Sequence, residues 1–393
     1  MRRSLFSSAT TWSTIQSLLK TQNSLTARMR SDCAASVMLK DVPQAAVIPA
    51  WKQSELLEFN RLLPDIVRDL TETDNRYYDV DISNKWFAKL LQYNMTGGSK
   101  MRGLAVVQAY RTLAAPGDLS EENFKLARIM GWCLEILHTS LGLTQDILNR
   151  AEHRNGKLCW YLHSPRQQPD EAPRLLHNAI FILLKKHFHN QSFYVDAMEL
   201  FHDISHKAMM GMVLELETQS DRLLNQYTMD RYSSIAKYKT AYHSFKLPVS
   251  LGLYMAGVRD LEMHRQARTI LLEMGHFYQV QKDFYNCFGN SEMLPGTDIE
   301  DGKCSWLVVV ALQRASVEQK QLLLESYGSK DPAKVEAVKQ LYMDLGLPST
   351  FKLYEEHTHD LICTQIQQIS RGLPHKLFYT YLKNFTIPLS NKF

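Results

Sequence analysis

Apolar residues recur every three to four positions along most of the chain from Glu55 onward, which is the period of a helix with one buried face. The first such segment runs from Leu56 to Leu70. Others span residues 105–113, 124–148, 175–188, 195–216, 232–245, 265–288, 305–312, 317–327, 332–345 and 351–369. Few stretches alternate between apolar and polar residues as a half-buried strand does. The pattern therefore predicts an all-α protein.

Turn-forming residues lie between these segments, at 115–117, 164–173, 294–296 and 346–348. No break divides the chain into parts of different composition, and no repeat with a period of about 20–50 residues is visible. We therefore expect one bundle of about ten helices.

The first 31 residues differ from the rest of the chain. They contain Arg2, Arg3, Lys20, Arg28 and Arg30 among many serines and threonines, and they contain no acid. A basic, hydroxyl-rich start of this kind is typical of a mitochondrial transit peptide, and a disordered extension without a targeting role is the alternative. We assign residues 1–45 to this segment and residues 46–393 to the folded domain. The expected location is mitochondrial or cytoplasmic.

Net charge, cysteine spacing and hydropathy limit the class of protein. The chain has 393 residues and a formal net charge of +4, which gives no electrostatic case for binding nucleic acid. The cysteines at positions 33, 133, 159, 287, 304 and 363 lack C-x-x-C spacing, which favours buried, reduced thiols in an intracellular protein. No run of about 18 apolar residues occurs, so we expect no transmembrane segment.

Two of the helical segments carry acids and amides one helical turn apart. The positions are Gln145, Asp146 and Asn149 in the first segment, and Lys282, Asp283 and Asn286 in the second. Side chains spaced in this way share one face of a helix. Paired carboxylates there would hold a hard cation such as Mg²⁺, but each segment has only one carboxylate.

Other segments offer positive charge to an anion. The glycine-rich turn at 97–103 precedes a helix, and the free backbone N–H groups at a helix start favour an anion. A turn that only starts the helix, without binding an anion, is the alternative. Residues 154–157 form a basic turn, and Lys237 and Lys239 lie on an apolar helix, where each either reaches water or pairs with an anion. The acidic loop at 296–306 lacks EF-hand spacing, so we do not expect calcium there.

Taken in order, these segments resemble the animal farnesyl diphosphate synthases, a class I (trans) prenyltransferase family. The resemblance extends from about Asn60 to Leu382. It is carried by GGSKMRGL (97–104), GWCLEIL (131–137), NGKLCWY (155–161), KYKTAYHSF (237–245), LLEMGHFYQVQ (271–281) and GTDIEDGKCSWLVV (296–309). So many matches in one order identify the chain as a member of that family.

The resemblance implies an all-α, isoprenoid synthase-type bundle around a deep central cavity, and a homodimer. It also implies two D-D-x-x-D motifs that hold Mg²⁺ ions, which grip the diphosphate of an allylic prenyl substrate until the substrate ionises. In prenyltransferases of the family, isopentenyl diphosphate then attacks the carbocation.

Residue by residue, the resemblance places the two motifs on the acid-and-amide segments. The implied metal-facing residues are Asp146, Asn149, Glu215, Asp283 and Asn286. Gln145 and Lys282 stand where the family has aspartates. Mg²⁺ prefers anionic oxygen, so we expect it to be the cofactor but to bind more weakly than in the family. Lys282 could act as a tethered cation in place of one metal charge.

The allylic diphosphate site implied by the resemblance is largely retained. Its residues are Arg154, Lys239, Thr240, Gln279 and Lys303, with Lys239, Thr240 and Gln279 as catalytic candidates. One family lysine is missing, because the loop at 290–296 is shorter than the family's.

The implied isopentenyl diphosphate site is more altered. Gly98 and Arg102 match the family, whereas Ser99, His138 and Asn155 replace a lysine, a glutamine and an arginine. Each lost cation removes a charge-assisted bond to phosphate worth about 1.5–3 kcal/mol. Lys100, one residue out of register, could restore part of this binding energy and bind diphosphate together with Arg102.

The floor of the implied chain pocket has also changed. Ser140 and Leu141 stand where farnesyl synthases often have aromatic residues. We therefore expect room for a longer or folded hydrocarbon.

Three interpretations follow. We favour a terpene synthase derived from a farnesyl diphosphate synthase, similar to those of some insect lineages, which converts farnesyl diphosphate to a sesquiterpene and needs no isopentenyl site. The second is a farnesyl diphosphate synthase with altered motifs, which condenses isopentenyl diphosphate with dimethylallyl or geranyl diphosphate. The third is a non-catalytic paralogue that forms a heterodimer with an active synthase.

Overall fold

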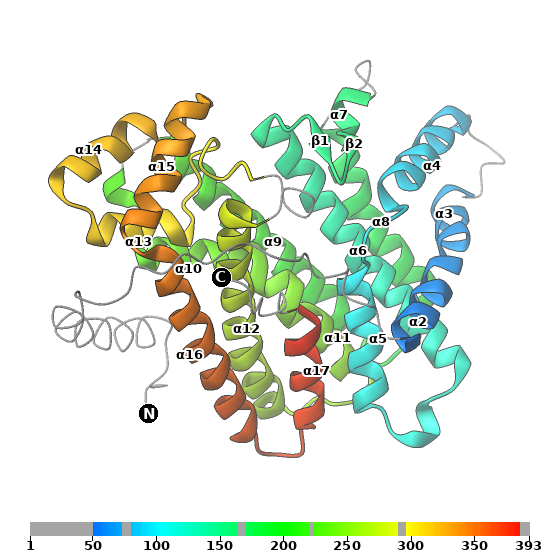
Figure 1. Ribbon diagram of the computed structural model, residues 1–393. Coiled ribbons are helices and arrows are strands. Elements are labelled where there is room, and N and C mark those ends of the chain that lie inside the picture. Colours follow the sequence, from blue (N-terminus) through cyan, green and yellow to red (C-terminus); the bar gives the residue numbers. More distant parts are fainter. Residues whose placement is uncertain (1–49, 73–79, 164–169, 221–223, 290–295, 386–393) are drawn as a thin grey trace.

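The computed structural model describes residues 50–72, 80–163, 170–220, 224–289 and 296–385 (Figure 1). The helices are α2 (Ala50–Arg61), α3 (Leu63–Thr71), α4 (Asp81–Met95), α5 (Met101–Leu113), α6 (Glu121–Asn149), α7 (Trp160–His163), α8 (Glu171–Phe188), α9 (Tyr194–Ser220), α10 (Met229–Ile235), α11 (Leu247–Met255), α12 (Leu261–Phe288), α13 (Trp306–Arg314), α14 (Val317–Ser326), α15 (Pro332–Asp344), α16 (Leu347–Gln367) and α17 (His375–Phe385). A π-helix spans Ala236–Lys246, 3₁₀ turns span Pro116–Asp118 and Leu224–Gln226, and a hairpin joins β1 (His153–Arg154) to β2 (Lys157–Leu158). The all-α prediction is confirmed.

The extension assigned to residues 1–45, and Cys33 within it, lie outside the described residues. The described cysteines are free thiols, as expected, and Cys133, Cys159 and Cys304 are buried. Within the described ranges, no helix combines the length and apolar character that a bilayer span requires.

The helices differ from the sequence prediction at several places, and α4, α7, α11 and α17 lie outside the predicted segments. The segment predicted as one helix from Leu56 to Leu70 is divided into α2 and α3, and Pro64 lies in the first turn of α3, where its missing N–H costs no hydrogen bond. Helix α11 was not predicted, because its residues from Leu247 to Leu253 are all buried. A helix that is apolar all round shows no amphipathic period.

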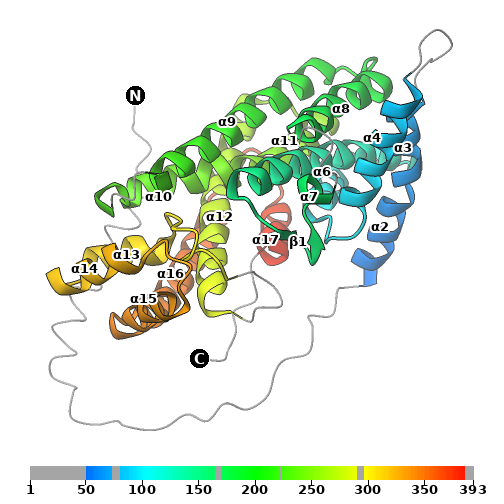
Figure 2. The same cartoon turned by 90° about the horizontal axis from the view of Figure 1, so that it is seen from above.

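Two apolar cores meet at α5 and α11. Helices α2 to α4 and α8 lie on one side of the molecule and α13 to α16 on the other, as both views show (Figures 1 and 2). On α11, Leu247 and Leu251 pack into the amino-terminal core, whereas Val249 and Leu253 pack into the carboxyl-terminal core. These pairs lie on opposite faces of the helix because residues four apart share a face. Helix α11 therefore joins the two halves into one body.

The π-helix lies between α9 and α12, which both pack against it. Two glycines allow the close approach. A Cβ on Gly211 of α9 would lie 2.5 Å from the backbone nitrogen of Lys239, and a Cβ on Gly275 of α12 would lie 2.4 Å from the Cβ of Ala241. Such π-helical turns are rare and frequently mark functional sites. The sequence predicted an ordinary helix over 232–245.

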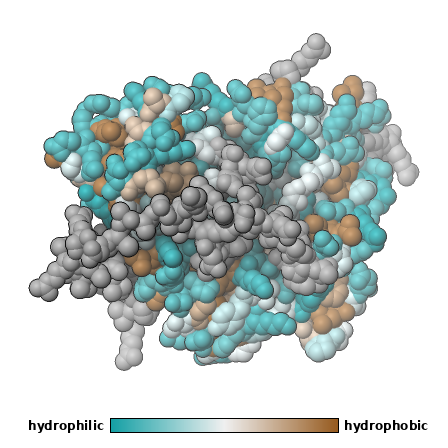
Figure 3. All heavy atoms as spheres, in the orientation of Figure 1, coloured by the Kyte–Doolittle hydropathy of each residue, from teal (hydrophilic) through white to brown (hydrophobic). Residues whose placement is uncertain are grey.

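The face shown in Figure 3 is mainly hydrophilic, with separate apolar patches. Exposed apolar side chains elsewhere gather on α8 and α9, where Ile182, Met209, Met210 and Val213 are exposed. Helices α8 and α9 lie along one edge of the molecule in the view from above (Figure 2).

Candidate active site

A hairpin brings the basic turn back to the end of α6. The helix ends where Arg150 adopts a left-handed conformation, with φ 51°. At the hairpin turn, Asn155 and Gly156 both have positive φ, 50° and 74°, as the two central residues of a type I′ turn require. Arg154, the last residue of β1, is thereby directed at Asp146.

Arg154 and Asp146 form a two-pronged ion pair. The Nε donates to Oδ2 at 2.6 Å, and Nη2 donates to Oδ1 at 2.7 Å and to the Gly142 carbonyl at 3.0 Å. Gly142 makes room for the guanidinium, because a Cβ there would lie 3.2 Å from the Arg154 Cζ. One turn along, Gln145 Nε2 donates to Asn149 Oδ1 at 2.8 Å. The polar groups of the first motif thus bond to one another and to Arg154.

The glycines beside the π-helix align the second part of the site. Glu215 follows Gly211 by four residues on α9 and forms an ion pair with Lys239 of the π-helix. On α12, Gln279 follows Gly275 by four residues, and its Oε1 accepts a hydrogen bond from Thr240 Oγ1 at 2.7 Å. The structure therefore places Lys239 in an ion pair with Glu215 and its neighbour Thr240 in a hydrogen-bonded network with Gln279.

The network continues to Asp283. Gln279 Nε2 donates to its Oδ1 at 2.6 Å, and the Trp306 backbone N–H donates to its Oδ2 at 2.9 Å. Asp283 is buried, and burial together with repulsion from Asp298 raises the pKa of its carboxyl group. Because Trp306 is the first residue of α13, Asp283 satisfies an N–H group that the helix itself leaves free.

The loop before α13 supplies a third cation. Lys303 Nζ pairs with Asp298 Oδ1 at 2.6 Å and with Asp301 Oδ2 at 3.3 Å. Burial opposes the charge, but Asp298 and Glu215 more than offset it and raise the pKa of Lys303. The Asp298 N–H donates to Asn286 Oδ1 at 3.2 Å. The sequence analysis missed Asp298, because it considered the acids of this loop only as calcium ligands. Lys303, five residues further along the same loop, was the signal that could have indicated an ion pair.

Two stacked histidines come from α6 and the π-helix. The His138 and His243 rings are 5.6 Å apart at an interplanar angle of 14°. Burial, then repulsion from Arg102, His243, Arg154 and Lys282, lowers the pKa of His138 well below its ordinary value. Burial also lowers the pKa of His243 to about 3. Both imidazoles are therefore neutral at pH 7.

The residues of the implied isopentenyl site differ in exposure and in their hydrogen-bond partners. Lys100 is only 8% exposed; its Nζ donates to the Gly97 carbonyl at 2.5 Å and lies 5.6 Å from the centre of the Trp132 ring. The ammonium of Lys100 is turned inward in the structure, and its expected role in binding diphosphate stays a prediction. Ser99 and Asn155 are exposed. Arg102 is half-buried, and its Nε donates to Ser244 Oγ at 2.9 Å.

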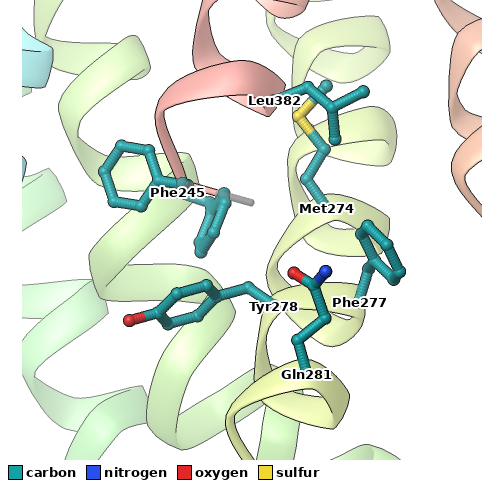
Figure 4. Close-up of a pocket in the computed structure, with 7 residues that line it drawn as sticks. Phe245, Met274, Phe277, Tyr278, Gln281 and Leu382 are labelled. Atoms are coloured by element: carbon teal, nitrogen blue, oxygen red, sulfur yellow. The ribbon is translucent and has the colours of Figure 1, made fainter. Parts of the chain in front are cut away.

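The residues proposed for the chain pocket lie on the buried part of α6. Ser140 Oγ donates to the Pro173 carbonyl of α8 at 2.8 Å, and Leu141 packs into the amino-terminal core. Two hollows of the described structure lie elsewhere. One is a narrow crevice between the π-helix, α12 and α17, where Phe245, Met274, Phe277, Tyr278, Gln281 and Leu382 face one another (Figure 4). The other, of about 710 Å³, is lined by α2, α3, α4 and Gly97. The larger chain pocket stays a prediction.

The donor set does not fit the cluster of Mg²⁺ ions that the resemblance implies. Asp146 is bound to Arg154, Glu215 to Lys239, and Asp283 to Gln279 and the start of α13. An ammonium, that of Lys282, stands beside Asp283 and repels a dication. In the part of the chain that the structure describes, no group of three or more acids, histidines or cysteines is arranged to hold a metal ion. Weakened Mg²⁺ binding remains a prediction, which a Mg²⁺ titration of activity tests.

Residues 84–345 of this helical bundle match the polyprenyl synthetase family, which makes the protein an enzyme of the prenyl diphosphate synthase type. The chain is 44% identical over 328 residues to farnesyl pyrophosphate synthase from Murgantia histrionica, a match that covers 83% of this chain and 80% of the relative. It is 39% identical over 335 residues to the chicken (Gallus gallus) enzyme of the same name, covering 84% of this chain and 91% of the relative. The chain belongs to the farnesyl pyrophosphate synthase family.

Proposed function

We propose that this enzyme ionises an allylic prenyl diphosphate. In this step the C–O bond to the diphosphate breaks, and its electron pair leaves with the diphosphate while a carbocation forms. Arg154, Lys239 and Lys303 neutralise the leaving group, as preorganised cations do best in a site shielded from water. To do so, each exchanges part of its bond to a carboxylate for a bond to the phosphate oxygens.

Thr240 and Gln279 have a supporting role in the same step. The hydroxyl of Thr240 and the amide of Gln279 hold the π-helix and α12 in register beside Lys239. Lys239, the residue before Thr240 on the π-helix, pairs with Glu215 on the neighbouring α9. We therefore assign them to positioning the leaving group.

We further propose that the carbocation then reacts within its own chain, which makes the enzyme a terpene synthase that converts farnesyl diphosphate to a sesquiterpene. The inward-facing Lys100 carries this proposal, because its Nζ is bound to the Gly97 carbonyl and cannot serve a second diphosphate without moving. Ser99 and Asn155 offer no charge in its place. A pocket that binds only the ionising partner has no use for isopentenyl diphosphate.

Farnesyl diphosphate synthase is the second candidate, and the relatives favour it over terpene synthesis. Two relatives with 44% identity, from Murgantia histrionica and Nezara viridula, are named farnesyl pyrophosphate synthase. Arg102 is retained, and its Nε donates to Ser244 Oγ. If it alone holds isopentenyl diphosphate, the carbocation is captured by that partner and the chain is extended by five carbons.

One pair of incubations decides between the candidates. Purified protein is supplied with Mg²⁺ and either farnesyl diphosphate alone or geranyl plus isopentenyl diphosphate, and the products are identified by mass spectrometry. A hydrocarbon or alcohol from farnesyl diphosphate alone supports terpene synthesis, whereas farnesyl diphosphate formed in the second incubation supports prenyl transfer. If neither reaction occurs with folded protein, the proposed ionisation is wrong and the non-catalytic partner is the remaining interpretation.

We also propose that the enzyme is a homodimer that associates through α8 and α9. The exposed apolar side chains Ile182, Met210 and Val213 support this surface, because contiguous apolar patches mark interfaces. Sedimentation of the wild type and of a Met210→Glu, Val213→Glu variant tests it: we expect a dimer and a monomer, respectively. A dimeric variant would contradict this surface.

For location, we propose that residues 1–45 direct the enzyme to mitochondria. Their basic, acid-free start supports this proposal. A fusion of this segment to a fluorescent protein should enter mitochondria in cells. A diffuse cytoplasmic signal would exclude targeting and leave a simple extension.

A further inference from the structure

Tyr93 of helix α4 contacts the hairpin that carries Arg154. The Tyr93 Oη donates a hydrogen bond of 2.8 Å to the carbonyl of Leu158, the last residue of β2. The Lys157 ammonium lies 5.5 Å from the centre of the Tyr93 ring, a cation–π contact, and its Nζ donates to Thr96 Oγ1 at 3.5 Å. Helix α4 therefore holds strand β2 through the backbone as well as through a side chain.

Rings on α4 also pack against α7, the short helix that follows β2 (Figure 1). The Tyr93 and His163 rings stack with centroids 4.7 Å apart and planes at 21°, and the Trp160 ring lies 5.4 Å from that of Tyr93. Another α4 ring, that of Trp86, lies 6.0 Å from Trp160. Trp86 precedes Tyr93 by seven residues, so the two share one face of α4. That face holds both β2 and the segment that follows it.

The hairpin lies on the surface of the protein. Lys157 is exposed, and the side chain of Leu158 is 40% exposed. At the base of the hairpin the Cys159 N–H donates to the Glu152 carbonyl at 2.8 Å, which closes the hairpin without joining it to a helix. A two-stranded hairpin on its own is only marginally stable in water. Its contacts with neighbouring helices therefore decide where it lies.

The two strands are held by different helices. Arg154 of β1 is paired in register with Lys157 of β2. Arg154 is bound to Asp146 of α6, whereas β2 is bound to Tyr93 of α4. When Arg154 exchanges part of its bond to Asp146 for a bond to phosphate, the hold of α6 on β1 weakens. The contacts between β2 and α4 involve neither Arg154 nor Asp146, so they persist during that exchange.

We propose that Tyr93 is a positioning residue for Arg154, because its hydrogen bond to the Leu158 carbonyl keeps the hairpin, and with it the guanidinium, directed at the substrate's diphosphate. Tyr93 acts through the hairpin and not by touching the substrate. The inference rests on the proposed function, which assigns Arg154 to the leaving group. It adds a residue of α4 that the sequence analysis did not single out.

Binding of inorganic diphosphate in the presence of Mg²⁺, measured by isothermal titration calorimetry, tests this role. Tyr93→Phe keeps the ring and removes only the hydroxyl, so it should weaken binding about two- to tenfold, as the loss of one hydrogen bond does. Arg154→Gln should weaken binding at least about tenfold, because a charge-assisted bond is lost. In the Arg154→Gln background, Tyr93→Phe should have no further effect, since the group that it positions is gone.

Tyr110→Phe is the matched control. The Tyr110 Oη on α5 also donates to a backbone carbonyl, that of Asp118, at 2.7 Å. The control should bind diphosphate as the wild type does. Hydrogen exchange then reports the contact itself: the amides of residues 152–159 should exchange faster in Tyr93→Phe than in the wild type, and at the wild-type rate in Tyr110→Phe. Thermal unfolding verifies that each variant is folded.

Three results would overturn the inference. Tyr93→Phe could bind diphosphate as tightly as the wild type, it could weaken binding by the same factor with and without Arg154, or it could leave the exchange of the hairpin amides unchanged. Equal weakening in both backgrounds would mean that the hydroxyl acts on the whole fold and not through Arg154. If the wild type binds no diphosphate, the proposed function fails as well, whereas binding by the wild type with no effect of Tyr93→Phe contradicts this inference alone.

Discussion

Asp283 holds the first N–H group of helix α13, accepting a hydrogen bond from Trp306 at 2.9 Å. The one carboxylate of the second motif therefore stabilises the folded protein, whether or not it also binds a ligand. We expect Asp283→Ala to lower the free energy of unfolding by about 1–3 kcal/mol, because a buried donor loses its partner. Urea denaturation measures this loss. A residue that served only to bind metal would leave the stability of the metal-free protein unchanged or higher.

The ion pair between Arg154 and Asp146 should couple the two residues energetically. Arg154→Gln leaves a buried carboxylate without its cation and should cost about 1–3 kcal/mol of unfolding free energy. Adding Asp146→Asn to that variant should restore part of the loss, since the uncompensated charge is then removed. Chemical denaturation of the two single variants and the double variant gives the coupling energy. Strict additivity would mean that the pair contributes nothing.

Lys239→Ala should reduce kcat/KM at least tenfold on whichever allylic diphosphate the enzyme ionises, because a charge-assisted contact to the leaving group is lost. The control is Lys237→Ala, two residues away on the same helix, where the ammonium pairs with Glu273. Steady-state kinetics should show little change for the control. Unchanged turnover in Lys239→Ala would remove this residue from the diphosphate site.

Gly275 should not tolerate a side chain. In Gly275→Ala the new Cβ would approach the Ala241 Cβ to 2.4 Å, so α12 and the π-helix must separate. We expect a loss of about 1–3 kcal/mol in stability and, because Gln279 moves with α12, a loss of activity. Gly117→Ala is the control, since nothing lies within 4 Å of a Cβ there. Thermal unfolding should separate the two variants, and equal midpoints would refute the close approach.

Acid should destabilise the protein through its buried histidines. His276 lies between Ser233 and Tyr354, and burial, then repulsion from Lys237, lowers its pKa to about 3. In the unfolded chain its pKa is near the ordinary value of about 6.5, so only the unfolded state gains a proton between these values. Stability contributed by neutral His276 is therefore present above about pH 6.5 and is lost as the pH falls toward 3, by up to about 1.4 kcal/mol per pH unit.

The variant His276→Gln tests that contribution. Denaturation midpoints at pH 7, 6 and 5 should fall less steeply in the variant than in the wild type. Identical slopes would mean that His276 does not remain neutral in the folded protein.

The sequence by itself determined the helical architecture, the family and the ionisable residues of both motifs, because helical period and motif order are local properties of the chain. It also predicted that Gln145 and Asn149 lie one turn apart, and they form a hydrogen bond. Only the tertiary structure decided which cations are already paired. Lys239 meets Glu215 from 24 positions away, and Thr240 meets Gln279 from 39 positions away, through close approaches at Gly211 and Gly275. The inward turn of Lys100 depends in the same way on how helices pack, since an electrostatic partner is set by distance in space and not by separation along the chain.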